Sequence, residues 1–87
     1  MKDQLINVEV ASHKETGLLL ATSSDLPGLM VHGRSLAEIE ERLPIAARDI
    51  LEHQGHRVMA VTVEKSRLSG NFWPAHVTVN ASMANAA

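Results

Sequence analysis

Apolar and polar residues alternate near the start of the chain with the period of two that is typical of a half-buried strand. Within residues 5–11, Ile6 and Val8 face one side while Asn7 and Glu9 face the other. We therefore predict a first strand in this segment. The same reasoning predicts strands at 18–23, 29–32 and 58–64, and it allows a short fifth strand at 75–79.

Helical spacing replaces this alternation after the third predicted strand. Ser35 can cap a first turn through its hydroxyl, and Glu38 can reach back toward that cap. Apolar residues then recur at helical intervals until Gly55, which provides a stop. Pro44 interrupts the pattern, because proline removes one helical hydrogen bond and pushes against the preceding turn. The helix either kinks or splits there, and the continuous apolar stripe favours one bent helix.

The predicted elements form an α+β fold in the order β-β-β-α-β. Right-handed crossovers are strongly preferred, so we expect the helix to cover one face of a small mixed sheet with strand order 3-2-1-4. A loop is expected at 65–71. One domain over 1–79 and a disordered tail over 80–87 complete the prediction.

The composition excludes several classes of protein. The chain has 87 residues, no cysteine and two aromatic side chains, so disulfide scaffolds, thiol catalysis and ring-lined cofactor pockets are not expected. The longest uninterrupted apolar run, Leu18 to Ala21, is far too short to cross a membrane. We therefore expect a cytoplasmic protein with no membrane segment and no cofactor.

The charge distribution argues against direct binding of nucleic acid. The formal net charge is −2, and residues 1–55 carry five basic and nine acidic side chains. Residues 56–87 carry three basic side chains and one acidic side chain. A nucleic-acid surface needs several clustered cations. The basic residues of the second segment are therefore interpreted as an ordinary solvated face.

Two motifs resemble the HicB-like antitoxin family. Asp25-Leu26-Pro27-Gly28 is followed by Gly33-Arg34-Ser35-Leu36-Ala37-Glu38. Members of that family share a D/E-L-P-G turn and a G-x-S/T-x-x-E helix start in this order. The motif positions are Asp25, Pro27, Gly28, Gly33, Ser35 and Glu38. The resemblance extends from about Ile6 to Val63 and implies a partial, truncated ribonuclease-H-like fold.

The same resemblance implies a function. HicB-like antitoxins bind and block HicA, a small ribonuclease encoded beside them, and catalyse nothing themselves. We therefore expect a protein that sequesters a HicA-type toxin. Family members usually continue into a DNA-binding segment, and the eight residues after Val79 are too few for one. The alternative is a solitary domain that acts as a homo-oligomeric interaction protein without a toxin.

Candidate contact residues lie on the third predicted strand and after the fourth. An exposed strand edge accepts partners, although His32 is equally compatible with a polar residue that discourages unwanted pairing. Two adjacent aromatic residues either fold over the core or contact a second copy of the chain. The candidate interface residues are Leu29, Met30, Val31, His32, Phe72 and Trp73.

Catalytic and metal-binding residues are not predicted. Glu9 and Glu64 are the carboxylates on predicted strands, and two-metal hydrolysis needs a converging third. His53 and His56 have a spacing that suits zinc, but the helix is expected to end between them at Gly55. A metal-dependent nuclease is therefore disfavoured.

Self-association, as a homodimer, is also expected. Two open sheet edges and one uncovered face would leave apolar residues such as Leu19 or Met59 partly exposed. Pairing between two copies would cover them.

Overall fold

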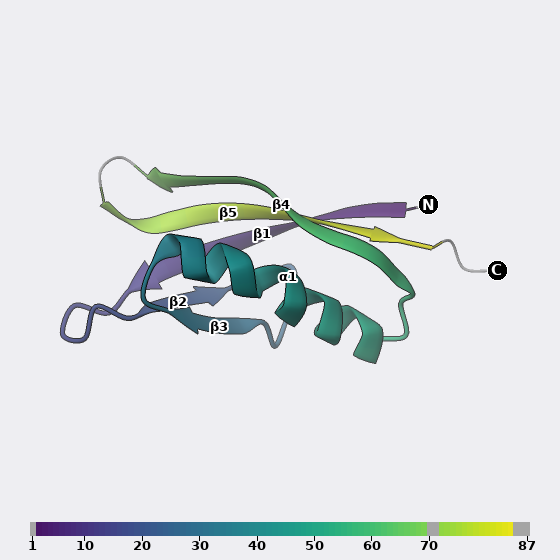
Figure 1. The fold of residues 1–87 in the computed structure, drawn as a ribbon, viewed down its shortest axis with the longest axis horizontal. Coiled ribbons are helices and arrows are strands. Elements are labelled where there is room, and N and C mark those ends of the chain that lie inside the picture. The colour runs from purple at the N-terminus through teal and green to yellow at the C-terminus, as the bar shows by residue number, and fades with distance from the viewer. Residues whose placement is uncertain (1, 70–71, 85–87) are drawn as a thin grey trace.

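A helix lies across one face of a five-stranded sheet (Figure 1). The computed structural model describes residues 2–69 and 72–84, and the side chains of 65–69, 72 and 73 lie outside that description. The α+β class predicted from the sequence is confirmed. The elements are β1 (Lys2–Ser12), β2 (Leu19–Thr22), β3 (Met30–Gly33), α1 (Leu36–His53), β4 (Val58–Ser69) and β5 (Phe72–Met83).

The strands follow one another across the sheet in the order β3-β2-β1-β5-β4, and all neighbours are antiparallel. The predicted mixed sheet of order 3-2-1-4 is wrong, because β5 lies between β1 and β4. β4 and β5 are adjacent in sequence and form a hairpin, and β5 then pairs with β1 along nearly its whole length. A hairpin closes a short loop, whereas a parallel pairing needs a long crossover, so the hairpin is favoured.

Both strands of this hairpin are longer than the sequence predicted. β4 continues to Ser69 and β5 begins at Phe72, so most of the predicted loop at 65–71 is strand. β5 also continues to Met83, so the predicted tail at 80–87 is wrong for residues 80–83, while 85–87 lie outside the described residues. The cause is a period-two pattern of buried apolar residues that continues past Val79. Its members are Ala75, Val77, Val79, Ala81 and Met83.

The core lies between α1 and the sheet face that α1 covers. Leu43 of α1 and Ile6 of β1 have no exposed surface. Burying a side chain of this size stabilises the fold by about 1.5–3 kcal/mol. Leu19 is only 3% exposed, so the prediction that it is partly uncovered is wrong, whereas Met59 is 52% exposed as predicted. Among the described residues, no helix is long and apolar enough to cross a membrane.

The predicted capping residue begins the helix. The Oγ of Ser35 accepts a hydrogen bond from the N–H of Glu38 at 3.2 Å. Glu38 Oε2 reaches back to the N–H of Arg34 at 3.4 Å, one residue before the expected cap. The helix is continuous through Pro44 and ends at His53, so the prediction of one helix rather than two is confirmed.

The turn after β2 fastens the chain to the middle of β1. Asp25 Oδ2 accepts a hydrogen bond from the N–H of Asn7 at 2.9 Å, and the side chain of Leu26 is buried in the core. The N–H of Leu29 donates to the carbonyl of Leu26 at 3.2 Å, and Gly28 has a φ of 92°. Proline followed by a glycine with positive φ fits the two central positions of a type II turn. The turn expected from the Asp25-Leu26-Pro27-Gly28 motif is therefore present.

Asn80 in β5 destabilises the fold, because its side-chain oxygen is buried and has no hydrogen-bond partner among the described residues. Leaving such a group unsatisfied costs about 1–3 kcal/mol. We expect Asn80→Val to raise the free energy of unfolding by about 1 kcal/mol, since valine has no polar atoms to satisfy and favours strands. Urea denaturation followed by circular dichroism measures the change. Thr78→Val on the same strand is the control, and a less stable Asn80→Val variant would contradict the prediction.

Candidate functional site

β3 packs closely against the start of α1 because its last residue has no side chain. A Cβ on Gly33 would lie 3.1 Å from Cδ1 of Ile39, which is tighter than ordinary van der Waals contact. Glycine therefore allows β3 and α1 to approach each other. Together they form the walls of a groove at the edge of the sheet.

The predicted interface residues on β3 and just before it divide into two groups. Met30 is 62% exposed and His32 is also exposed, whereas Leu29 and Val31 are buried. Successive residues of a strand point to opposite faces, so four consecutive residues cannot all present side chains to a partner. Leu29 and Val31 therefore direct their side chains mainly toward the core, and their role as contact residues stays a prediction. Met30 and His32 remain accessible, and their role as contact residues stays a prediction.

The groove between β3 and α1 has a volume of about 560 Å³. Ile45 projects from α1 beside it and is 71% exposed, the highest value among the exposed large apolar side chains of the described residues. The residues that line the groove are Met30, Val31, His32, Arg42, Ile45, Ala46, Arg48, Asp49 and Glu52. A groove that combines apolar and charged side chains beside a strand edge suits a protein segment better than a small polar molecule.

A second hollow, of about 410 Å³, lies beside β3 at the connection between β1 and β2. Leu18, which is 39% exposed, and His32 both line it. Three of the five large apolar side chains exposed in the described residues therefore line hollows on or beside β3: Leu18, Met30 and Ile45. We call these three residues and His32 the edge surface. Clustered exposed apolar groups mark interaction sites more often than scattered ones do.

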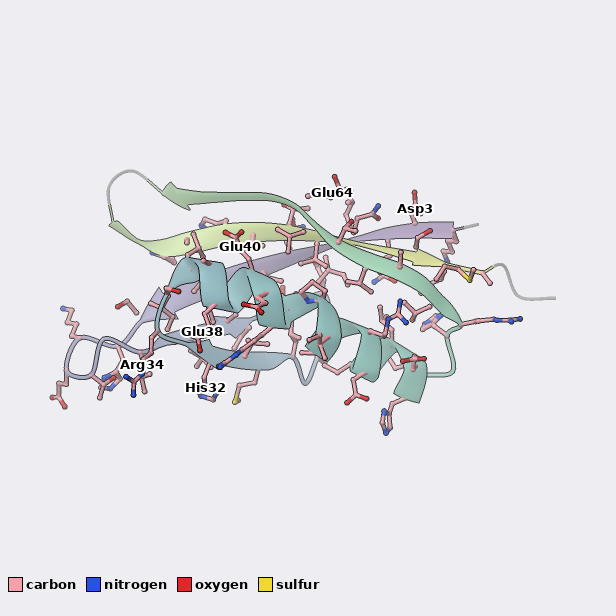
Figure 2. The ribbon with its side chains drawn as sticks, viewed as in Figure 1. Asp3, His32, Arg34, Glu38, Glu40 and Glu64 are labelled. Atoms are coloured by element: carbon pink, nitrogen blue, oxygen red, sulfur yellow. The ribbon has the colours of Figure 1, made fainter. Side chains whose placement is uncertain are left out.

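Arg42 closes part of the free strand edge. Its Nη1 donates to the carbonyl of His32 at 2.8 Å, and its Nη2 lies 2.6 Å from Oε1 of Glu38. Figure 2 shows Glu38 leaving α1 on the side of β3, where His32 also lies, and Glu40 leaving on the opposite side. Because Arg42 donates a hydrogen bond to the carbonyl of His32, that carbonyl is not available to another strand, and β3 is protected against indiscriminate pairing. A partner would therefore contact mainly the side chains of the edge surface.

The helix beside the edge surface is acidic. α1 carries five acidic and two basic side chains, a net charge of −3 with histidine neutral. Of the two cations, Arg42 is paired with Glu38 and Arg48 donates to the carbonyl of Met59 on β4 at 3.3 Å. Asp49 and Glu52 line the groove. The surface is thus suited to a partner with positive charge around an apolar contact.

The carboxylates and histidines that the sequence offered as metal ligands do not converge. Glu9 lies on β1 and Glu64 on β4, with β5 between them. His53 ends α1, with its Nδ1 2.9 Å from the carbonyl oxygen of Asp49, and His56 lies beyond the helix. In the part of the chain that the structure describes, no three histidine, aspartate or glutamate side chains are placed to hold a metal ion.

A polar hollow of about 600 Å³ lies on the uncovered face of the sheet, where β2 ends. Glu9 and His76 are directly opposite each other on β1 and β5 and both line it, together with hydroxyl groups from β2 and β5. The Oγ of Ser23 donates to the carbonyl of Asn7 at 2.6 Å. These groups are arranged for hydrogen bonding, and sequence reasoning did not bring them together.

Two predicted contact residues lie outside the description, and two residues of the groove were not predicted. The side chains of Phe72 and Trp73 lie outside the described residues, so their predicted role has no structural account here. Ile45 and Arg42 were missed. The signal for Ile45 was available, because it is a large apolar residue that does not belong to the apolar stripe of the helix.

Comparison with known proteins identifies a family for this chain. No curated protein and no solved structure matches the chain significantly. A family model described as a domain of unknown function, DUF1902, matches residues 5–67. This range contains β2, β3 and α1 and most of β1 and β4, so it includes the whole edge surface. The chain therefore belongs to the DUF1902 family.

Proposed function

We propose that this chain is an antitoxin-like protein that binds a HicA-type ribonuclease through its edge surface and thereby inhibits it. The observation that carries the proposal is that the exposed residues Met30 and Ile45 line a groove at β3 and the exposed residue Leu18 lines a hollow beside it, with His32 lining both. The chain acts by covering a partner and performs no chemistry itself. In this proposal the fold is a variant of the truncated ribonuclease-H-like unit.

The motifs support this assignment because each has a structural role next to the edge surface. The turn containing Asp25 and Gly28 sets the start of β3, and the cap at Ser35 sets the start of α1. Both motifs lie inside the family match at residues 5–67. A partner-binding groove is therefore built from the same segments on which the resemblance to HicB-like antitoxins rests.

The charge of α1 supports the choice of partner. A ribonuclease of the HicA type binds RNA and is expected to present positive charge at that surface. The net charge of −3 on α1 would attract such a surface and accelerate association. Covering the cationic surface of the toxin would also exclude its RNA.

A second function, a solitary homo-oligomeric interaction protein, is favoured by one observation. The sheet face opposite α1 is uncovered and exposes Leu5 at 61%. This function requires no toxin. The homo-oligomeric function predicts that no toxin is encoded beside the chain, whereas the antitoxin function requires one.

The test is co-expression with the product of the adjacent reading frame. We expect the two proteins to copurify and the growth arrest caused by the neighbour to be relieved. Ile45→Ser should weaken binding tenfold or more, since burying an isoleucine in an interface contributes about 1.5–3 kcal/mol. Isothermal titration calorimetry measures the affinity.

Met59→Ser is the matched control, because Met59 is a large apolar residue on β4 that is also exposed, at 52%, but is not one of the residues that line the groove. It should leave the affinity unchanged. An equal loss of affinity in both variants would show that the edge surface is not the contact. A neighbouring product that neither copurifies nor arrests growth would contradict the antitoxin assignment itself.

A further inference from the structure

The groove between β3 and α1 has an acidic end. Met30, Ile45 and Ala46 form its apolar part, and the carboxylates of Asp49 and Glu52 line it farther along the helix. Helical residues four and seven positions apart are separated by about 6 Å and about 10.5 Å along the helix axis. The two carboxylates therefore lie one to two turns beyond Ile45, toward the end of α1.

The cations that line the groove do not neutralise this acidic end. Arg42 is paired with a carboxylate of the first helical turns, and the guanidinium of Arg48 donates to a carbonyl of β4. Asp49 Oδ1 lies 3.9 Å from Nδ1 of His53, and an ion pair between side chains as exposed as these is weak. Glu52 has no ion-pair partner among the described residues. Both carboxylates can therefore pair with a cation of another molecule.

The position of Glu52 in α1 is unfavourable for folding. The helix ends at His53, so Glu52 lies in its last turn. The C-terminal end of a helix carries partial negative charge, which favours cations there and disfavours carboxylates. A residue that opposes its own helix is typical of a functional site, so contact with a partner accounts for Glu52 better than folding does.

The free edge of β3 indicates which kind of segment occupies the groove. A strand added to β3 would need its outward backbone groups, and Arg42 already donates to the carbonyl of His32 at 2.8 Å. A helix needs no backbone hydrogen bonds from its partner and can lay an apolar face into a groove. A second copy of α1 carries the same acidic end, so two copies would repel each other there.

We propose that the groove binds a basic amphipathic helix of the partner. An apolar side chain of that helix packs between Met30 and Ile45, and a lysine or arginine one turn away pairs with Asp49 or Glu52. This binding mode rests on the function proposed above and specifies the contact element of the partner. One helical turn spans about 5.4 Å, which matches the separation of about 6 Å between Ile45 and Asp49 along α1. The acidic end therefore fixes the position of the bound helix.

An NMR titration of the isotope-labelled full chain with synthetic helical peptides tests the binding mode without a toxin. One peptide carries leucine and lysine one turn apart on a neutral background, and the other carries glutamate in place of lysine. The basic peptide should shift the signals of the groove residues and bind about fivefold more tightly than the acidic peptide. Glu52→Lys should abolish this preference. Glu64→Lys makes the same charge change on β4, at the other edge of the sheet, and should retain it.

Glu52→Lys should also raise the urea midpoint of the chain, because a cation replaces an anion near the end of α1. Weaker binding of the basic peptide with a higher midpoint separates a contact role from a structural one. Groove signals that do not shift, equal effects of Glu52→Lys and Glu64→Lys on binding, or a lower midpoint for Glu52→Lys would overturn the proposal. A toxin that binds the wild-type chain and both variants equally well would overturn only the helix contact and leave the antitoxin function standing.

Discussion

Replacing Leu43 with alanine is expected to lower the free energy of unfolding by about 2–5 kcal/mol. Leu43 has no exposed surface and lies in the middle of α1, between the helix and the sheet. A domain of this size is stabilised by about 4–13 kcal/mol in total. The variant therefore loses a large part of its stability, and urea denaturation monitored by circular dichroism measures the loss.

Ile45→Ala is the control on the same helix. Ile45 is two residues away and 71% exposed, so its truncation should change the free energy of unfolding by less than about 0.5 kcal/mol. The pair separates stability from binding, because Ile45 is proposed to contact a partner and Leu43 is not. Similar losses of stability in both variants would show that α1 does not pack on the sheet as described.

The local elements could be predicted because their signals are local. Alternation identified β1, and the spacing from Ser35 onward identified α1 together with its cap. The strand order could not be predicted in this way. It depends on whether β4 pairs with β1 or with β5, and both pairings would bury the same apolar residues of β4. The choice was decided by β5, whose inward positions include small residues such as Ala81 that gave a weak hydrophobic signal.

The candidate site was predicted in part. The third strand was recognised as an edge, which is correct, and this placed Met30 and His32 among the accessible residues. The other half of the surface comes from α1 and could not be located without knowing which side of the helix lies against β3. Ile45 and Arg42 reach the site through that packing. A helix position outside the apolar stripe is a contact residue only once the neighbouring strand is known.

Replacing Pro44 with alanine is expected to raise the free energy of unfolding by about 2 kcal/mol. Pro44 is the ninth residue of the 18-residue helix α1, where proline has no N–H to donate into the helix. Alanine is favoured over proline in a helix interior by about 3 kcal/mol. The half-buried proline ring loses packing contacts in the variant, and this loss reduces the gain in stability by about 1 kcal/mol. Pro27→Ala is the matched control, because this exposed proline occupies a turn that suits it, and its replacement should lower stability by about 0.4–1 kcal/mol. The two substitutions should therefore shift the urea midpoint in opposite directions, and a decrease in both would mean that packing of the Pro44 ring outweighs the helical hydrogen bond.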